Sequence, residues 1–213
     1  MENMGGHWRE RVKGFVFSTD IMKRDDYSQW KEDNQFFPTP KAVAKRVAEL
    51  SGVKEYAYKD RPSILEPSAG HGALLEQLDS FVKKTSSFYV VEPNEENADE
   101  LNKLGYEVER MSFERFYNKH IHEKEHITHV VMNPPFSFSR DIKHTMMAYE
   151  LLRPNGVLVS VVSENSLYYD NDNTKEFNDW LKEHNAYIEP IPYGAFKESG
   201  TTVDTVIIKV VKE

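Results

Sequence analysis

Short apolar segments alternate with longer amphipathic ones along most of this sequence, and this alternation constrains the fold more than any other feature. The apolar segments predict strands at residues 63–66, 88–91, 106–109, 127–132 and 157–162. The intervening segments predict helices at residues 40–51, 73–81 and 95–104, from the end of the fourth strand to about residue 152, and at 174–184. Strands that alternate with helices indicate a parallel sheet covered on both faces.

The last two predicted strands, residues 187–191 and 203–211, have no helix between them. We therefore expect these two strands to pair antiparallel. The whole pattern predicts a doubly wound α/β fold whose mostly parallel sheet has about seven strands, one of them antiparallel. At the start of the first helix, Thr39 is predicted to be the cap and Pro40 to be the first helical residue.

The length of 213 residues suits one single-core domain. We expect residues 36–213 to form this domain, because residues 1–35 mix both charges and show no clean hydrophobic period, as is typical of an arm. The sequence has no Cys, which excludes disulfides and thiolate metal sites and fits a reducing cytosol. No apolar run predicts a transmembrane segment or a signal peptide, so a cytoplasmic protein without membrane contact is expected.

The formal net charge is −8, from 27 basic and 35 acidic residues. Phosphate contacts normally supply much of the affinity of a nucleic-acid enzyme, so an acidic total works against this class of function. Either a local basic face exists within the acidic total, or the excess charge only aids solubility.

The segment from Leu65 to Gly72 joins the first predicted strand to its helix. Gly70 and Gly72 let the backbone bend tightly and approach a ligand closely. Glu92 ends the second strand about 20 residues further on, a spacing that suits a carboxylate accepting hydrogen bonds from ribose hydroxyls. The turn lacks a third glycine, and Glu66 would repel a phosphate but accept from an amino group. Adenosine joined to a cationic amino acid therefore fits better than a dinucleotide, and the alternative is an ordinary strand-to-helix turn.

Asn133-Pro134-Pro135-Phe136 follows the fourth predicted strand. Consecutive prolines fix the backbone and lack N–H donors, and Asn133 adds an amide oxygen as a second acceptor. Two acceptors that face one NH2 group would hold both its hydrogens and turn the nitrogen lone pair toward a methyl donor. Phe136 offers an aromatic face for a flat base. The alternative interpretation is a turn that proline makes rigid.

From about Gln35 to its end, the chain resembles the N6-adenine DNA methyltransferases of the class I S-adenosylmethionine-dependent, Rossmann-like fold. Phe36 to Pro40 looks like the segment that contacts the methionine end of the cofactor, and Gly194-Ala195-Phe196 looks like the late loop whose Phe stacks on a flipped base. Ser112-Phe113 stands where the family usually has Asp-Phe. The resemblance implies that the cofactor is bound by Phe37, Thr39, Pro40, Glu66, Pro67, Ser68, Ala69, Gly70, Gly72, Glu92, Ser112, Phe113 and Asn133.

The same resemblance implies methyl transfer to adenine N6 in DNA, with Asn133, Pro134, Pro135 and Phe136 as the catalytic motif and with Phe136 and Phe196 stacking on the flipped base. Similar motifs serve methyltransferases that act on RNA bases or on protein glutamine, so these substrates are the alternative. A further alternative is a catalytically silent cofactor-binding subunit. No target-recognition domain is expected, so sequence specificity would come from a partner or from self-association. The arm either caps the cofactor site or contacts bases.

Four histidines, His120, His122, His126 and His129, precede or enter the fourth predicted strand. A metal site would need acidic or Cys partners at close spacing and ligands held on rigid elements. A solvated loop is the preferred interpretation, and no metal is expected.

Overall fold

The structure is a computed structural model, and it describes residues 7–9, 14–16, 37–78, 80–122 and 126–213. The chain divides into two compact units, Met1–Gln35 and Phe36–Glu213. In the first unit, β1 (His7–Arg9) and β2 (Gly14–Val16) pair antiparallel. The remainder of the predicted arm lies outside the described residues, as does Phe36.

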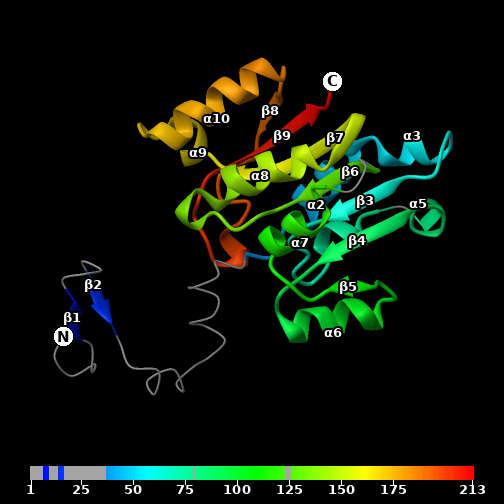
Figure 1. Cartoon of the computed structure of the whole chain (residues 1–213), viewed down its shortest axis with the longest axis horizontal. Helices are drawn as coiled ribbons and strands as arrows, with labels where there is room; N and C mark the ends of the chain where they lie inside the picture. Colours follow the sequence, from blue (N-terminus) through cyan, green and yellow to red (C-terminus); the bar gives the residue numbers. More distant parts are fainter. Residues whose placement is uncertain (1–6, 10–13, 17–36, 79, 123–125) are drawn as a thin grey trace. The chain divides into compact units, whose positions relative to one another are not determined.

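Within the described part of the second unit, a seven-stranded sheet has the order β5-β4-β3-β6-β7-β9-β8. Its strands are β3 (Ser63–Glu66), β4 (Ser87–Val91), β5 (Val108–Glu109), β6 (Ile127–Met132), β7 (Leu152–Ser163), β8 (Tyr187–Pro190) and β9 (Thr205–Val211). Only β9 runs against its neighbours β7 and β8, and Figure 1 shows its arrow pointing opposite to those of β3 and β4. The predicted doubly wound, mostly parallel sheet and the antiparallel pairing of the last two strands are confirmed.

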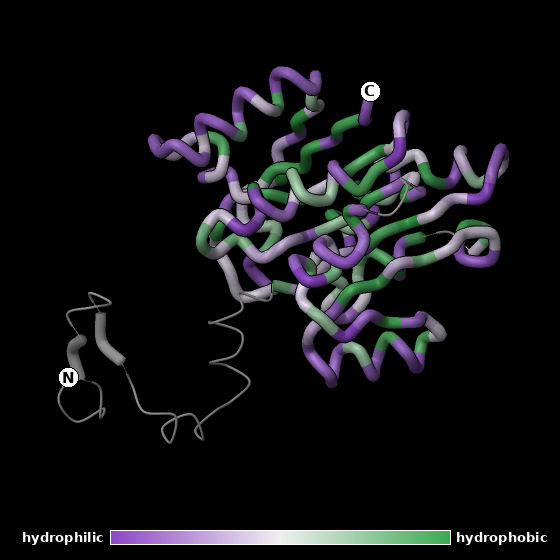
Figure 2. Tube along the Cα trace, in the orientation of Figure 1, coloured by the Kyte–Doolittle hydropathy of each residue, from purple (hydrophilic) through white to green (hydrophobic). Residues whose placement is uncertain are grey.

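Helices cover the sheet. They are α2 (Lys41–Ser51), α3 (Val53–Ala57), α4 (Ala73–Glu76), α5 (Ser80–Thr85), α6 (Glu95–Lys103), α7 (Phe113–His120), α8 (Arg140–Glu150), α9 (Asn165–Tyr168) and α10 (Asp172–Glu183), with short 3-10 turns η4 (Ser137–Ser139) and η5 (Lys197–Ser199). Every residue of the central strand β6 is buried, as expected of a parallel strand covered on both faces. Figure 2 shows hydrophobic residues along the strands and hydrophilic residues on the outer helices.

Three local predictions are wrong. Thr39 does not cap α2, because Pro40 occupies the N-cap and the Thr39 hydroxyl is hydrogen-bonded to Asn133. The helix predicted at 73–81 is divided into α4 and α5. The strand predicted at 157–162 already begins at Leu152 as β7, so that Pro154-Asn155-Gly156, a sequence typical of a turn, lies inside it. There Asn155 has a φ of 62° and donates its N–H to the Lys212 carbonyl, so the segment is an irregularity within the sheet.

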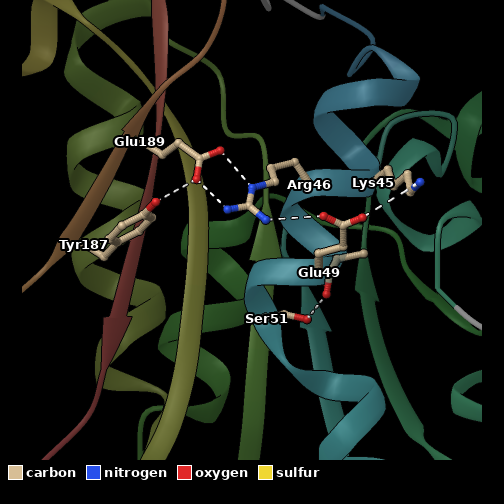
Figure 3. A network of polar contacts seen from close by, with 7 residues as sticks. Lys45, Arg46, Glu49, Ser51, Tyr187 and Glu189 are labelled. Atoms are coloured by element: carbon tan, nitrogen blue, oxygen red, sulfur yellow. Dashed lines mark hydrogen bonds and ion pairs between the residues drawn. The ribbon is translucent and has the colours of Figure 1, made fainter.

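Arg46 ties α2 to the edge strand β8, as Figure 3 shows. Its Nε and Nη2 atoms donate to the two carboxylate oxygens of Glu189 at 2.8 and 2.7 Å. Tyr187 also donates its hydroxyl to Glu189, at 2.8 Å. A bidentate pair of this kind fixes orientation as well as distance. It therefore helps to hold α2, and with it the preceding Phe37–Pro40 segment, against the sheet. None of the helices in the described ranges combines the length and the apolar character needed to cross a membrane.

Candidate active site

Three polar side chains meet at one edge of the sheet because β4, β3 and β6 are adjacent and parallel. Glu66 is the last residue of β3, Glu92 follows β4, and Asn133 follows β6. The carboxyl ends of neighbouring parallel strands form the edge where α/β sheets bind ligands. The structure thus brings together the glycine turn, the second-strand carboxylate and the Asn-Pro-Pro-Phe motif.

The loop after β3 is held in place by the end of β4. The Ala69 N–H donates to the Val91 carbonyl at 3.1 Å, and the Gly70 N–H donates to Glu92 Oε2 at 2.7 Å. Gly70 and Gly72 have φ angles of 53° and 81°, a region that glycine adopts without strain. A Cβ at Gly72 would also lie 2.8 Å from the side chain of Leu101. The two glycines are therefore needed for this loop to pack as it does.

Glu92 is a buried carboxylate that holds two loops. Besides the Gly70 N–H, it accepts the Asn94 N–H at 2.8 Å. Burial raises the pKa of the Glu92 carboxyl, and the two N–H bonds offset part of this shift. The Asn97 side chain also lowers this pKa, so of the roughly four lone-pair sites of a carboxylate at most two remain open. The role of Glu92 in fixing the glycine loop was missed from sequence.

Glu66 carries an unused acceptor in the interior. Its side chain is 1% exposed, and its Oε1 accepts the Ser68 N–H at 3.3 Å. Its Oε2 is buried and has no hydrogen-bond partner among the described residues. Burial raises the pKa of the Glu66 carboxyl well above its usual range, the Ser68 bond opposes this shift, and the charge of Glu92 adds to it. A buried acceptor without a hydrogen-bond donor is costly. The Oε2 atom of Glu66 therefore fits a ligand that brings a cationic amino group.

Asn133 is oriented by the segment that precedes α2. Its Nδ2 donates to the Phe37 carbonyl at 3.2 Å and to the Thr39 hydroxyl at 3.0 Å. A backbone carbonyl can only accept, so the amide nitrogen must face Phe37 and the amide oxygen must face away. That oxygen, Oδ1, is buried and is without a hydrogen-bond partner within the described ranges. The Ser68 hydroxyl donates to the Asn133 carbonyl at 3.3 Å, which links the glycine loop to the motif.

Phe136 lies between two other rings. Its centroid is 6.3 Å from that of Phe37, with the planes at 18°, and 6.4 Å from that of Phe196, which packs edge-on. Phe196 is 1% exposed and presents no open face for a base in this conformation. The late loop is fixed by a hydrogen bond from the Ser199 hydroxyl to the Pro38 carbonyl at 2.6 Å. Phe136 is half-buried, so it is the more accessible of the two predicted stacking rings.

The remaining predicted residues lie at or near the same edge. Pro40 caps α2, Pro67 and Pro134 are buried, and Pro135 is half-buried. Ser112 is the N-cap of α7, where its hydroxyl accepts the Arg115 N–H at 3.4 Å, and Phe113 packs in the core. The capping bond uses one acceptor site of the Ser112 hydroxyl, and the predicted contact of Ser112 with a cofactor stays a prediction.

Sequence reasoning also missed Asp141, which is fully buried near the start of α8. Its Oδ2 accepts the Ser163 N–H at 2.9 Å and the Ser166 hydroxyl at 2.6 Å. These bonds connect the helix that follows the Asn-Pro-Pro-Phe motif to the end of β7. The signal in the sequence is only an Asp near a helix start, which most often serves the helix itself.

The solvated loop predicted for the four histidines is wrong for two of them, since His120 is the last residue of α7 and packs on Phe116, and His129 lies in β6. His129 is buried in β6, where its Nδ1 lies 2.8 Å from the Thr128 hydroxyl and Tyr56 packs edge-on against its ring. Burial, with smaller effects from the charges of Arg153 and Lys209, lowers the pKa of His129 to about 4. In the part of the chain that the structure describes, no group of three or more His, Asp or Glu side chains is placed to hold a metal ion.

Comparisons with known proteins define the fold. No protein-family model matches the sequence, and no curated protein matches it. The structure is similar to a methyltransferase subunit of the type I restriction-modification system from Streptococcus thermophilus, with a TM-score of 0.69, 20% identity, and coverage of 83% of this chain and 45% of that chain. It is also similar to a structure from Listeria monocytogenes that carries the name class I S-adenosylmethionine-dependent methyltransferase, with a TM-score of 0.58, 15% identity, and coverage of 92% and 69%.

A third similar structure is fibrillarin from Aeropyrum pernix in complex with S-adenosyl-L-methionine, with a TM-score of 0.52, 15% identity, and coverage of 78% of this chain and 76% of that chain. The strand order of the sheet and the similarity to these structures indicate the same fold. The chain has the fold of the class I S-adenosylmethionine-dependent methyltransferases, as predicted. It spans less than half of the length of the restriction-modification subunit.

Proposed function

We propose that this chain transfers a methyl group from S-adenosylmethionine to an exocyclic nitrogen, and that the nitrogen is N6 of adenine in DNA. One observation carries the proposal. The amide nitrogen of Asn133 is occupied by Phe37 and Thr39, which leaves a buried amide oxygen without a partner among the described residues. An acceptor fixed in this way suits a hydrogen of an NH2 group.

Two carboxylates and the glycine loop would hold the cofactor. Glu66 supplies the unused acceptor for the amino group of the methionine part, and Glu92 supplies its remaining lone pairs to ribose hydroxyls. Phe37, Thr39 and the Gly70–Gly72 turn lie beside them through the bonds already described. S-adenosylmethionine, when bound, supplies an activated methyl group, so the protein's main contribution is positioning.

At the target, we assign Asn133 Oδ1 and the Pro134 carbonyl as the two acceptors for one amine. Holding both hydrogens turns the nitrogen lone pair away from the ring system of the base. Phe136 would stack on the base, which must leave its duplex at a cost of a few kcal/mol. Phe196, buried behind Phe136, would reach a base only if the late loop moved. Otherwise it supports the Phe136 ring from the core side.

The choice of DNA rests on the Asn-Pro-Pro-Phe resemblance and agrees with the restriction-modification subunit among the similar structures. With a net charge of −8, we expect weak binding and a shallow dependence on salt. We also expect little sequence preference of the chain alone, with specificity coming from a partner or a second copy of the chain. The same chemistry on RNA or on a protein amide is the alternative outcome.

The deciding experiment incubates the pure chain with labelled S-adenosylmethionine and separate pools of DNA, RNA and protein, and maps methylation along a long DNA. Label in DNA at adenine N6 supports the proposal, whereas robust label only in RNA or protein overturns the choice of substrate.

Asn133→Ala should lower the rate on the order of a hundredfold and leave cofactor affinity in calorimetry nearly intact. Asn118→Ala, an exposed Asn on α7, is the matched control. Wild-type turnover by Asn133→Ala would reduce the motif to a rigid turn.

A further inference from the structure

Phe138 combines a strained backbone conformation with an exposed aromatic ring, and neither feature stabilises the fold. Its φ and ψ are 56° and 34°, and Ser139 after it has 55° and 30°. Two consecutive left-handed residues are unusual outside glycine, and for a bulky aromatic side chain this conformation is a genuine outlier. The ring is also 91% exposed, so no burial compensates for the strain. Strained residues of this kind cluster at active sites and at segments that contact ligands.

The ring is held close to the candidate active site by a short, anchored connection. Phe138 lies in η4, two residues after Phe136 and two residues before α8 begins at Arg140. The start of α8 is fixed by Asp141, which accepts hydrogen bonds from Ser163 at the end of β7 and from Ser166 in α9. The exposed ring is therefore presented from a defined position beside the motif that we assign to the target amine.

Three other exposed aromatic rings lie in segments that come after β7 and β8. Tyr168 and Tyr169 lie at the end of α9, the short helix that follows β7, and Tyr193 comes after β8, with exposed fractions between 66% and 78%. Since β6, β7 and β8 run in the same direction, their carboxyl ends lie at one edge. Aromatic faces at such an edge suit flat, stackable ligands such as nucleobases.

The positively charged side chain of Arg140 lies close to the Phe138 ring. The guanidinium carbon of Arg140 lies 5.9 Å from the ring centroid. Arg140 forms no salt bridge with the residues that the structure describes, although the chain as a whole is acidic. A flat apolar face next to a guanidinium that has no acidic partner among the described residues matches a nucleotide, because the base stacks on the ring and the phosphate pairs with the cation. An apolar peptide would use the ring but not the charge.

We propose that Phe138 stacks on the nucleobase adjacent to the target in the substrate strand, with Arg140 contacting the phosphate between the two nucleotides. This inference rests on the proposed function, since it requires a nucleic-acid substrate. Stacking on the neighbouring base compensates for part of the stacking that the target loses when it enters the site. Phe138 is then a substrate-binding residue distinct from Phe136, which contacts the target base itself.

The test uses the full chain and a dye-labelled single-stranded DNA of mixed sequence that contains adenine. Phe138→Ala should weaken binding in fluorescence anisotropy by roughly 5- to 150-fold, the range expected for loss of one stacked base. Phe138→Trp should keep the affinity, and the DNA should quench the added tryptophan fluorescence relative to wild type. Arg140→Gln should weaken binding and reduce the salt slope by about 1. Tyr58→Ala is the control, because Tyr58 is a 67% exposed ring that follows α3, before β3 begins.

The outcomes separate this inference from the proposed function. Equal DNA affinity for wild type and Phe138→Ala, or no quenching in Phe138→Trp, overturns the inference even if the chain methylates DNA. Weaker binding by Phe138→Ala together with quenching in Phe138→Trp supports it. If this pattern appears while no nucleic acid is methylated, Phe138 is a nucleobase-binding residue, but the proposed function fails and with it the placement of that base next to a target. Calorimetry should show unchanged S-adenosylmethionine affinity for Phe138→Ala, and a large loss there would overturn a role confined to the substrate.

Discussion

Replacing Glu66 with glutamine should weaken the binding of S-adenosylmethionine and, in its absence, stabilise the fold. Glutamine has the shape of Glu66 and can still accept the Ser68 N–H through its oxygen. It places an NH2 group where Oε2 now lies, so the unused acceptor becomes a donor. An amino group of the ligand would then meet a donor. Loss of a hydrogen bond to a charged acceptor costs about 1.5–3 kcal/mol, or roughly a 10- to 150-fold weaker Kd.

The effect on stability has the opposite sign. Burial raises the folded-state pKa of Glu66 above that of an exposed glutamate, so the unliganded fold loses stability as the pH rises from the unfolded pKa through the raised one. Glutamine does not titrate and avoids this loss. The NH2 group of glutamine is also buried there without a partner among the described residues, so the gain is the avoided cost of ionisation alone and appears as a higher Tm of Glu66→Gln at high pH. The difference in Tm should grow with pH above the range where an exposed Glu titrates.

The assay pairs isothermal calorimetry for S-adenosylmethionine with thermal melts of the unliganded protein over a pH series. Glu76→Gln, an exposed carboxylate on α4, is the matched control and should change neither quantity. For the wild type, cofactor affinity should rise with pH through the raised pKa, because the carboxylate is the form that binds an amino group. Unchanged affinity in Glu66→Gln would refute the assignment of Oε2. A Tm that is equal to wild type at every pH would refute the argument from burial.

Two further predictions concern other buried groups. Glu92→Ala should weaken S-adenosylmethionine binding by about 1.5–3 kcal/mol. It should also lower the Tm, because the Gly70 and Asn94 N–H groups lose their acceptor. Calorimetry that shows wild-type affinity would remove Glu92 from the cofactor site. His129 has a folded pKa of about 4 against about 6.5 when unfolded, so the fold should lose about 3 kcal/mol as the pH falls through this window. Denaturant unfolding of wild type and His129→Gln at pH 7 and pH 4 measures the loss, and an equal pH dependence in both proteins would contradict it.

The sequence predicted those features that depend on short-range pattern. The run from Ile127 to Met132 is apolar enough to be a central strand, and the structure gives it those bounds with every residue buried. Strand ends follow from the same pattern, so the sequence also placed Glu66, Glu92 and Asn133 at the carboxyl ends of their strands. Because parallel neighbouring strands end at one edge, this local information was sufficient to group the three residues.

Local propensity gave a wrong answer where a distant segment competes for the same atom. Thr39 is a good capping residue by type, but its hydroxyl hydrogen-bonds Asn133, which is 94 residues further along the chain. In the same way, the turn at Asn155 is incorporated into the sheet because its N–H finds the carbonyl of Lys212. These choices depend on which groups become neighbours after folding, and no window of the sequence contains both partners.

The sequence alone therefore determined the kind of sheet, the edge that carries the site and the residue types gathered there, because these follow from hydrophobic period and strand direction. Only the tertiary structure decided the state of each group. It fixed the Asn133 amide through the Phe37 carbonyl, left one oxygen of Glu66 without a partner among the described residues, and buried Phe196 while it exposed Phe138. The reason is physical: hydrogen-bond satisfaction and solvent exposure are properties of the packed surroundings, and those surroundings come from segments far apart in the chain.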